Sequence, residues 1–148
     1  FESTYGGRFR MVIYRNIIDG TEHVVLTKGK IDPDKPTLVR MHRVDMAADM
    51  LGQNEARRDY VPRALAAIAA YDGAGAAVFI RDSNPAWLSE RYGQPDVSQT
   101  ENVLRDYGVG AQILIDLGVR DMKLLTSSKT VLPASGGYGV RILGRVPL

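Results

Sequence analysis

The feature that most constrains the fold is the continuous apolar run from Ala76 to Ile80, which follows a loop rich in glycine and alanine. A strand with one solvated face alternates apolar and polar residues, so a short uninterrupted run indicates a central strand buried on both faces. The chain has 148 residues, 45% of them hydrophobic, which is enough to bury one core of ordinary size. We therefore expect residues 1–148 to form a single domain around this strand.

The segments around this run alternate between strand and helix patterns. Apolar Phe9, Met11 and Ile13 recur with a period of two, and the turn signal Asp19–Gly20 follows them. Segments 8–14 and 23–28 are therefore expected to be strands that pair as a hairpin or meander. Further strands are predicted at 37–41, 122–125 and 140–143, and helices at 44–51, 60–71, 87–91 and 110–117. The predicted fold class is α/β, a mixed β-sheet flanked by helices.

Composition argues against several classes of function. The formal net charge is +2 and 24% of residues are charged, without a basic stripe, which argues against nucleic acid as the partner. No apolar run reaches the roughly 20 residues that span a bilayer, and the first residues lack a signal-peptide pattern. The absence of cysteine excludes disulfides, thiolate nucleophiles and cysteine-bound metals. We expect a soluble, cytoplasmic domain, cut from a longer polypeptide because its first residues look like a loop entering a strand.

The most specific motif lies in the second half of the chain. Residues 105–120 read RDYGVGAQILIDLGVR, and residues 123–126 read KLLT. This stretch closely resembles the RDYGIGAQIL-DLGV-R-LLT segment of GTP cyclohydrolase II. The GRVPL at 144–148, Arg40–His42 and the strand segment 22–26 resemble further family motifs, in the same order. The resemblance therefore spans nearly the whole chain and implies the fold of that family.

The resemblance implies a specific zinc chemistry. Members of the family open the imidazole ring of GTP and release formate and pyrophosphate at the start of the riboflavin pathway. Their zinc is held by three cysteines in a pattern close to H-S-E-C followed by C-D-C-G. The reaction needs the metal because zinc lowers the pKa of bound water from 15.7 to about 7, which supplies hydroxide near neutral pH.

This chain lacks the cysteines of that pattern. Aligning His42–Asp45 with H-S-E-C places Asp45 at the first cysteine position, and Ala56 and Arg58 at the other two. Ala56 has no ligand atom, and Arg58 would repel a cation. A replacement site built from His42, Asp45, Asp49 and Glu55 is the alternative, although no recognised spacing supports it. We expect no metal cofactor, with His42 packing or capping and with Asp45 and Asp49 as solvated helix positions.

Two further parts of the family's machinery have changed. Only Arg81 remains of the R-Q-E-G-R-G-I-G-L motif that contacts guanine and phosphates. The family's D-x-R-x-Y becomes residues 103–107, which puts Val103 where an aspartate acts as a base. Tyr92 is a candidate for a tyrosine that the resemblance implies near the catalytic centre. These differences, together with the missing cysteines, predict the loss of catalysis.

Several residues at nucleotide-binding positions are nevertheless present. Arg105 occupies the family's nucleophile position and is expected to be inactive. Vestigial GTP or phosphate contacts are expected from Arg40, His42, Arg81, Thr126 and Lys129. The alternative is that Arg40 and Arg105 form structural salt bridges with Asp82 or Asp106.

Three functions follow from these observations. The first is a non-catalytic domain that supports a 3,4-dihydroxy-2-butanone 4-phosphate synthase domain in the same chain, through dimerisation, stability or regulation. The second is a divergent active GTP cyclohydrolase II, or a relative with a new reaction on a nucleotide. The third is a sensor of GTP or of a flavin-pathway intermediate. The family resemblance also implies a homodimer.

Overall fold

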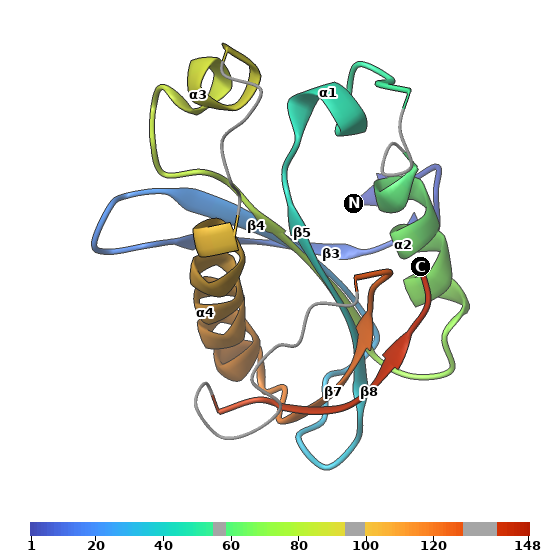
Figure 1. Ribbon diagram of the computed structural model, residues 1–148. Coiled ribbons are helices and arrows are strands. Elements are labelled where there is room, and N and C mark those ends of the chain that lie inside the picture. Colours follow the sequence, from blue (N-terminus) through green and yellow to red (C-terminus); the bar gives the residue numbers. More distant parts are fainter. Residues whose placement is uncertain (55–58, 94–99, 129–138) are drawn as a thin grey trace.

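A mixed six-stranded sheet forms the centre of the protein. The computed structural model describes residues 1–54, 59–93, 100–128 and 139–148, and for 100–104 the backbone alone. In spatial order the sheet contains β3 (Arg10–Arg15), β4 (Glu22–Lys28), β6 (Gly75–Ile80), β5 (Thr37–Arg43), β7 (Asp121–Leu125) and β8 (Arg141–Val146) (Figure 1). A separate pair consists of β1 (Glu2–Ser3) and β2 (Gly7–Arg8). The predicted α/β class with a mixed sheet is confirmed.

The strand directions divide the sheet into two parts. The pairs β3–β4 and β4–β6 are antiparallel. The first of these pairs is the one that the turn signal at Asp19–Gly20 predicts. The pairs β5–β6, β5–β7 and β7–β8 are parallel. The apolar run forms β6 as predicted, with Ala76, Ala77 and Val78 all 0% exposed. This strand is central because its small and β-branched residues pack on both faces.

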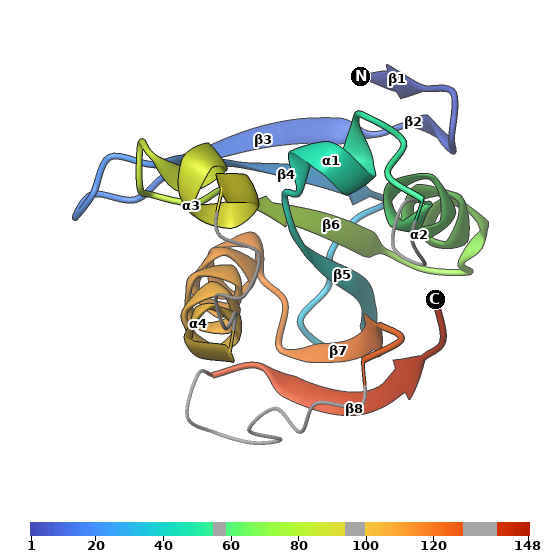
Figure 2. The same cartoon turned by 45° about the horizontal axis from the view of Figure 1, so that its top comes forward.

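Helices cover both faces of the sheet. The helices are α1 (Met46–Asp49), α2 (Tyr60–Ala70), α3 (Trp87–Gly93) and α4 (Thr100–Leu117). Figure 2 shows α2 and α4 on opposite sides of the sheet. The apolar stripe of α2, with Leu65 and Ile68, packs with Leu38 of β5, whereas Leu114 of α4 packs with Val39 on the other face. Among the described helices, none combines the length and apolarity needed to cross a bilayer.

Helix α4 is longer than the periodicity of its sequence predicts. It begins at Thr100. The expected helix began at 110, because the glycines at 108 and 110 usually weaken a helix. The glycine at 110 has a packing role, because a Cβ there would lie 2.9 Å from the Met41 sulfur. Helix α1, in contrast, is shorter than expected and ends at Asp49.

Strand β3 buries the opposite face from the one that its apolar alternation suggests. Met11 and Ile13 are 46% and 52% exposed, whereas Val12 and Tyr14 pack on the core beside α4. The Tyr14 hydroxyl donates to Asp116 Oδ2 on α4 at 2.6 Å. Packing against α4 therefore determines which face of this edge strand is buried. The local periodicity of the sequence does not predict this contact.

Candidate functional site

The carboxyl ends of β5, β6 and β7 lie at the same edge of the sheet, because β5 is parallel to both neighbours. We call this the carboxyl edge; in open α/β sheets ligands bind outside it. Four of the expected nucleotide-contact residues belong to these strands or directly follow them: Arg40 and His42 on β5, Arg81 after β6, and Thr126 after β7. Lys129 lies outside the described residues.

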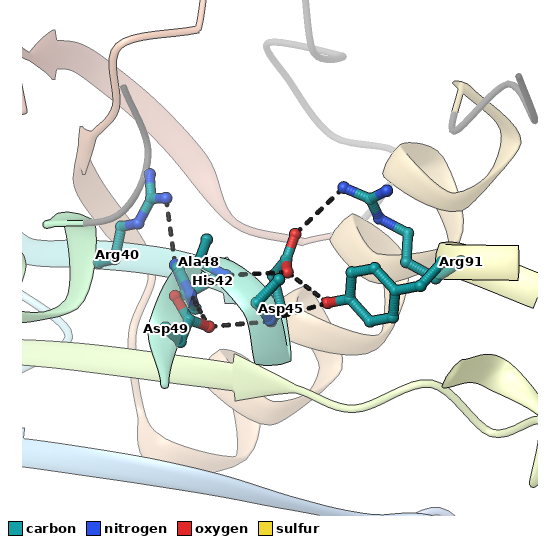
Figure 3. Close-up of polar contacts among 8 residues, drawn as sticks. Arg40, His42, Asp45, Ala48, Asp49 and Arg91 are labelled. Atoms are coloured by element: carbon teal, nitrogen blue, oxygen red, sulfur yellow. Dashed lines mark hydrogen bonds and ion pairs between the residues drawn. The ribbon is translucent and has the colours of Figure 1, made fainter. Parts of the chain in front are cut away.

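His42 is 2% exposed, and both of its ring nitrogens have partners. Its Nδ1 lies 3.3 Å from Arg40 Nη2, and its Nε2 lies 2.8 Å from Asp49 Oδ2 (Figure 3). A guanidinium can donate but cannot accept, so Nδ1 accepts and Nε2 carries the proton that it donates to Asp49. The ring also packs edge-on against Phe79. His42 therefore packs against Phe79 and links Arg40 to Asp49 through its two ring nitrogens.

Asp45 and Asp49 join the same network from helix α1. Asp45 is the N-cap residue, and its carboxylate accepts a hydrogen bond from the Ala48 amide at 3.2 Å. The backbone amide of Asp45 donates to Asp49 Oδ2 at 2.8 Å. Asp45 is 8% exposed, and the side chain of Asp49 is 11% exposed. The expectation that both are solvated helix positions is wrong, because the Asp45 carboxylate caps α1 and the Asp49 carboxylate is bonded to the His42 ring and to the Asp45 amide.

Helix α3 supplies two further partners of Asp45. Arg91 Nη2 lies 3.2 Å from Asp45 Oδ2, and the Tyr92 hydroxyl donates to Oδ1. The Tyr92 oxygen accepts from the Ala47 amide at 3.0 Å. Burial, with a further contribution from the Asp45 carboxylate, raises the pKa of Tyr92 above its usual value, which keeps the hydroxyl protonated as a donor. We call His42, Asp45, Asp49, Arg91 and Tyr92 the Asp45 cluster.

Arg40 is held on three sides at the carboxyl edge. It is 8% exposed, its Nη1 donates to the Leu125 carbonyl at 3.3 Å, and its guanidinium lies 5.1 Å from the centroid of the Tyr60 ring. Besides the contact with His42, these interactions bind Arg40 to β7 and to the start of α2. Cation–π stacking and carbonyl contacts leave a planar guanidinium fixed in orientation, which suits either a structural role or a preformed anion contact.

The other expected contact residues are more exposed. Arg81 is exposed, and its amide donates to Nδ1 of the buried His23 at 3.0 Å. Thr126 is half-buried, and its Oγ1 accepts from the Ser128 amide at 3.0 Å. Arg105 is exposed on α4. Arg40 and His42 are thus in direct contact. The hydrogen bonds of Arg81 and Thr126 given above are with other residues, and within the described part of the chain Arg105 forms no hydrogen bond to Arg40 or His42.

The sequence did not identify Arg43 as a candidate site residue. Its Nη1 donates to both carboxylate oxygens of Asp106, at 3.0 and 2.8 Å, and its Nη2 donates to Asp82. The hydrogen-bonded partner of both aspartates is thus Arg43, whereas Arg105 contributes a favourable charge near Asp106. Arg43 reaches them because it follows His42 on β5 and so points to the opposite face of the sheet, where α4 lies. Burial raises the pKa of Asp106, and the Arg43 guanidinium partly offsets this.

Sequence comparison identifies the family of this chain. The family model described as GTP cyclohydrolase II matches residues 1–147. The chain belongs to the GTP cyclohydrolase II family. The resemblance expected from the motifs at 105–126 and 144–148 is thereby confirmed over essentially the whole chain.

Individual relatives of this GTP cyclohydrolase II family member are longer proteins. The riboflavin biosynthesis protein RibBA of Bacillus subtilis is 36% identical over 159 residues, which cover 96% of this chain and 39% of the relative. The probable bifunctional riboflavin biosynthesis protein RIBA 2 of Oryza sativa subsp. japonica, chloroplastic, is 35% identical and covers 96% and 28%. The chain therefore spans between about a quarter and two fifths of these relatives' lengths.

A solved structure supports the same relationship. The crystal structure of RibBX, a two domain 3,4-dihydroxy-2-butanone 4-phosphate synthase from A. baumannii, aligns with a TM-score of 0.53 and 29% sequence identity. The alignment covers 96% of this chain and 37% of that chain.

The candidate replacement ligands that the structure describes do not fit a zinc ion. Of the four candidate replacement ligands, Glu55 lies outside the described residues, as do Ala56 and Arg58. Each of the other three is engaged: His42 with Arg40 and Asp49, and Asp45 with a guanidinium that would repel a cation. Within the described ranges, no group of three or more His, Cys, Asp or Glu side chains could hold a metal ion.

Proposed function

We propose that this domain does not open the GTP ring, and that it acts as a structural or regulatory partner of a dihydroxybutanone phosphate synthase domain in the same chain. The proposal combines family membership with the chemistry of the carboxyl edge. It places the domain in the cytoplasm as part of a homodimer, and treats residues 1–148 as one domain of that longer protein.

The observation that carries the proposal is the engagement of the Asp45 carboxylate. Asp45 aligns with the first zinc-binding cysteine of the family, and here both of its oxygens are bound by side chains of α3 (Figure 3). A guanidinium supplies the positive charge next to this position. A carboxylate that is paired in this way is a poor metal ligand, because the metal must displace a charged hydrogen bond that stabilises the fold.

Sequence differences elsewhere support the same conclusion. The chain contains no cysteine. Val103, which aligns with the family's catalytic aspartate, cannot accept a proton. Three independent requirements of the reaction, the metal, the base and the guanine-contact motif, are therefore changed together, which is hard to reconcile with ring opening by the usual chemistry.

The partner assignment rests on the relatives. One is named a probable bifunctional riboflavin biosynthesis protein, and RibBX is named a two domain dihydroxybutanone phosphate synthase. A domain that has lost its own reaction while remaining attached to a synthase would be kept for stability, dimerisation or control of that synthase. Deleting it should lower the stability, oligomeric state or activity of the synthase in the full-length protein.

The direct test measures formate release and metal content together. The purified protein is incubated with GTP, with zinc and with magnesium, beside RibBA of Bacillus subtilis as a reference. We expect no formate and substoichiometric zinc after dialysis. Stoichiometric metal with formate release would establish the alternative, a divergent active cyclohydrolase.

A nucleotide sensor is the second candidate, and the preformed position of Arg40 favours it. Isothermal titration with GTP separates this function from a purely structural one. Binding without turnover that is lost in Arg40→Gln or Arg105→Ala would indicate a sensor. The absence of heat would leave the structural role.

A further inference from the structure

A second concave site lies away from the carboxyl edge. A cavity of about 680 Å³ opens between the start of β3, the end of β4 with its following loop, and the last turn of α4. Four of its lining side chains are cationic: Arg8, Arg10, Lys28 and Lys30. None of its lining residues is acidic. A cavity of this size falls within the range of small-molecule sites, which is roughly 300 to 1,000 Å³.

Strand register separates this cavity from the Asp45 cluster. Lys28 pairs with Gly75, the first residue of β6, whereas His42 pairs with Phe79 near the end of the same strand. Four residues of strand correspond to roughly 13 Å along the sheet. Because β4 runs antiparallel to β6, the end of β4 lies at the edge of the sheet opposite to the carboxyl edge. The cavity is therefore a distinct site.

The four cations are not equally available. The Lys28 ammonium donates to the Tyr71 carbonyl and, at 3.0 Å, to the Gly73 carbonyl, where it stabilises the end of α2. The Arg8 guanidinium forms an exposed ion pair with Glu2 at 3.4 Å. Arg10 and Lys30, in contrast, form no ion pair with any residue in the described part of the chain. Two like charges that form no direct ion pair beside a cavity favour the binding of an anion.

The loop after β4 gives the cavity its shape. Gly29 has a φ of +75°, and a Cβ there would lie 3.3 Å from the Ala74 Cα, so a side chain would be both strained and crowded. The turn at Gly29 brings Lys28 and Lys30 to the same cavity. Ile31 and Leu117 add apolar wall, which a bare inorganic ion would not use.

We propose that this cavity binds a small organic phosphate, with Arg10 and Lys30 contacting the phosphate oxygens and with Ile31 and Leu117 packing against the organic part. Guanidinium and ammonium groups together suit phosphate, because one donates in a planar fork and the other acts as a compact charge. The site is independent of the proposed loss of GTP ring opening at the carboxyl edge.

The test is isothermal titration of the purified protein with ADP as the probe, at about 0.1 M salt, where exposed charges are screened beyond about 10 Å. We expect the double substitution Arg10→Gln with Lys30→Gln to weaken binding by about tenfold or more. The charge-conserving pair Arg10→Lys with Lys30→Arg should keep most of the affinity. Lys35→Gln, an exposed cation outside the cavity, is the matched control and should bind as the parent does.

Four results would overturn the proposal. The first is the absence of ADP binding in the parent, and the second is equal weakening by Lys35→Gln. The third is weakening by Arg40→Gln but not by the double substitution, which would place the probe at the carboxyl edge. The fourth is tighter binding of a polyglutamate peptide than of ADP, which would indicate an acidic protein partner. Circular dichroism melting of each variant verifies that the fold is retained, and the exposure of Arg10 and Lys30 makes this expected.

Discussion

The hydroxyl of Tyr92 donates a hydrogen bond to the carboxylate of Asp45, and this contact ties helix α3 to the turn that begins α1. The two residues are 47 positions apart in the chain. The same hydroxyl accepts from the Ala47 amide, so one side chain serves both the cap of α1 and its first turn. No residue of α3 is buried, so polar contacts at one end have a large share in holding this helix.

Replacing Tyr92 by phenylalanine should therefore destabilise the protein locally. The change removes one donor to a nearly buried carboxylate and one acceptor for an amide, which corresponds to about 1 to 2 kcal/mol of unfolding free energy. Hydrogen exchange should show weaker protection in α3 and at the start of α1. Tyr5→Phe is the matched control, since Tyr5 is 50% exposed and its hydroxyl makes no hydrogen bond to a described residue. Equal exchange in parent and Tyr92→Phe would contradict the prediction.

Arg43→Gln should also lower the stability of the protein. The side chains of Arg43, Asp82 and Asp106 are 25%, 21% and 19% exposed, so their ion pairs are partly shielded from water. Removing the guanidinium leaves two carboxylates close together with the charge of Arg105 as a weaker compensation. We expect a cost of about 2 kcal/mol, less than for a fully buried pair. Urea denaturation measures this change.

A double variant distinguishes ion pairing from lost packing. If the loss of stability in Arg43→Gln arises from repulsion between the Asp82 and Asp106 carboxylates, adding Asp106→Asn should recover part of that stability. One of the two carboxylates is then replaced by a neutral amide. Additive losses in the double variant would mean that the Arg43 stem, and not its charge, stabilises the start of α4.

His23 should make stability fall in mild acid. Burial is the main cause that lowers the pKa of His23 below its usual 6.5, and Asp19 partly offsets this. The unfolded chain then binds more protons than the folded one between the folded pKa and 6.5. The stabilisation is fully present above 6.5 and is lost as pH falls through that window. Protonation would also break the bond that the His23 Nδ1 accepts from the Arg81 amide.

The measurement compares urea midpoints near pH 7.5 and near pH 5.5 for the parent and His23→Asn. Asparagine keeps an acceptor for the Arg81 amide but does not titrate in this range. The parent should lose more stability than the variant between the two pH values. An identical loss in both proteins would assign the acid sensitivity to other groups.

The sequence predicted those parts of the fold that depend on local pattern. The apolar run at 76–80 became the central strand, and the turn at Asp19–Gly20 separates two antiparallel strands. Both results follow from side-chain periodicity and turn chemistry, which act over a few residues. The predicted start of α4 was wrong, because the glycine at 110 does not end the helix and instead lies where a Cβ would approach the Met41 sulfur to 2.9 Å.

The contacts of the candidate site depend on pairs that are distant in the chain. Arg40 and His42 lie close together because they are two residues apart on one strand, which the sequence implied. Arg91 meets Asp45, and Arg43 meets Asp106, only after α3 and α4 have docked. No local signal distinguishes these arginines from other surface arginines. The family motifs do not reveal these pairs either. Asp45 stands where this chain departs from the family pattern, whereas Asp106 lies within the matching motif at 105–120, which does not indicate its partner.

Restoring the missing cysteines should restore zinc without restoring catalysis. The triple substitution Asp45→Cys, Ala56→Cys and Arg58→Cys places thiols at the positions that align with the family's ligands, and it releases Arg91 from its pairing with Asp45. Three thiolates bind zinc far more strongly than the paired carboxylate, so about one zinc per chain should survive dialysis. Formate release from GTP should stay absent, because Val103 cannot serve as a base. Asp45→Cys alone is the control and should not retain zinc. Formate release by the triple variant would mean that the metal was the only lost requirement, and that the proposed loss of catalysis rests on the cysteines alone.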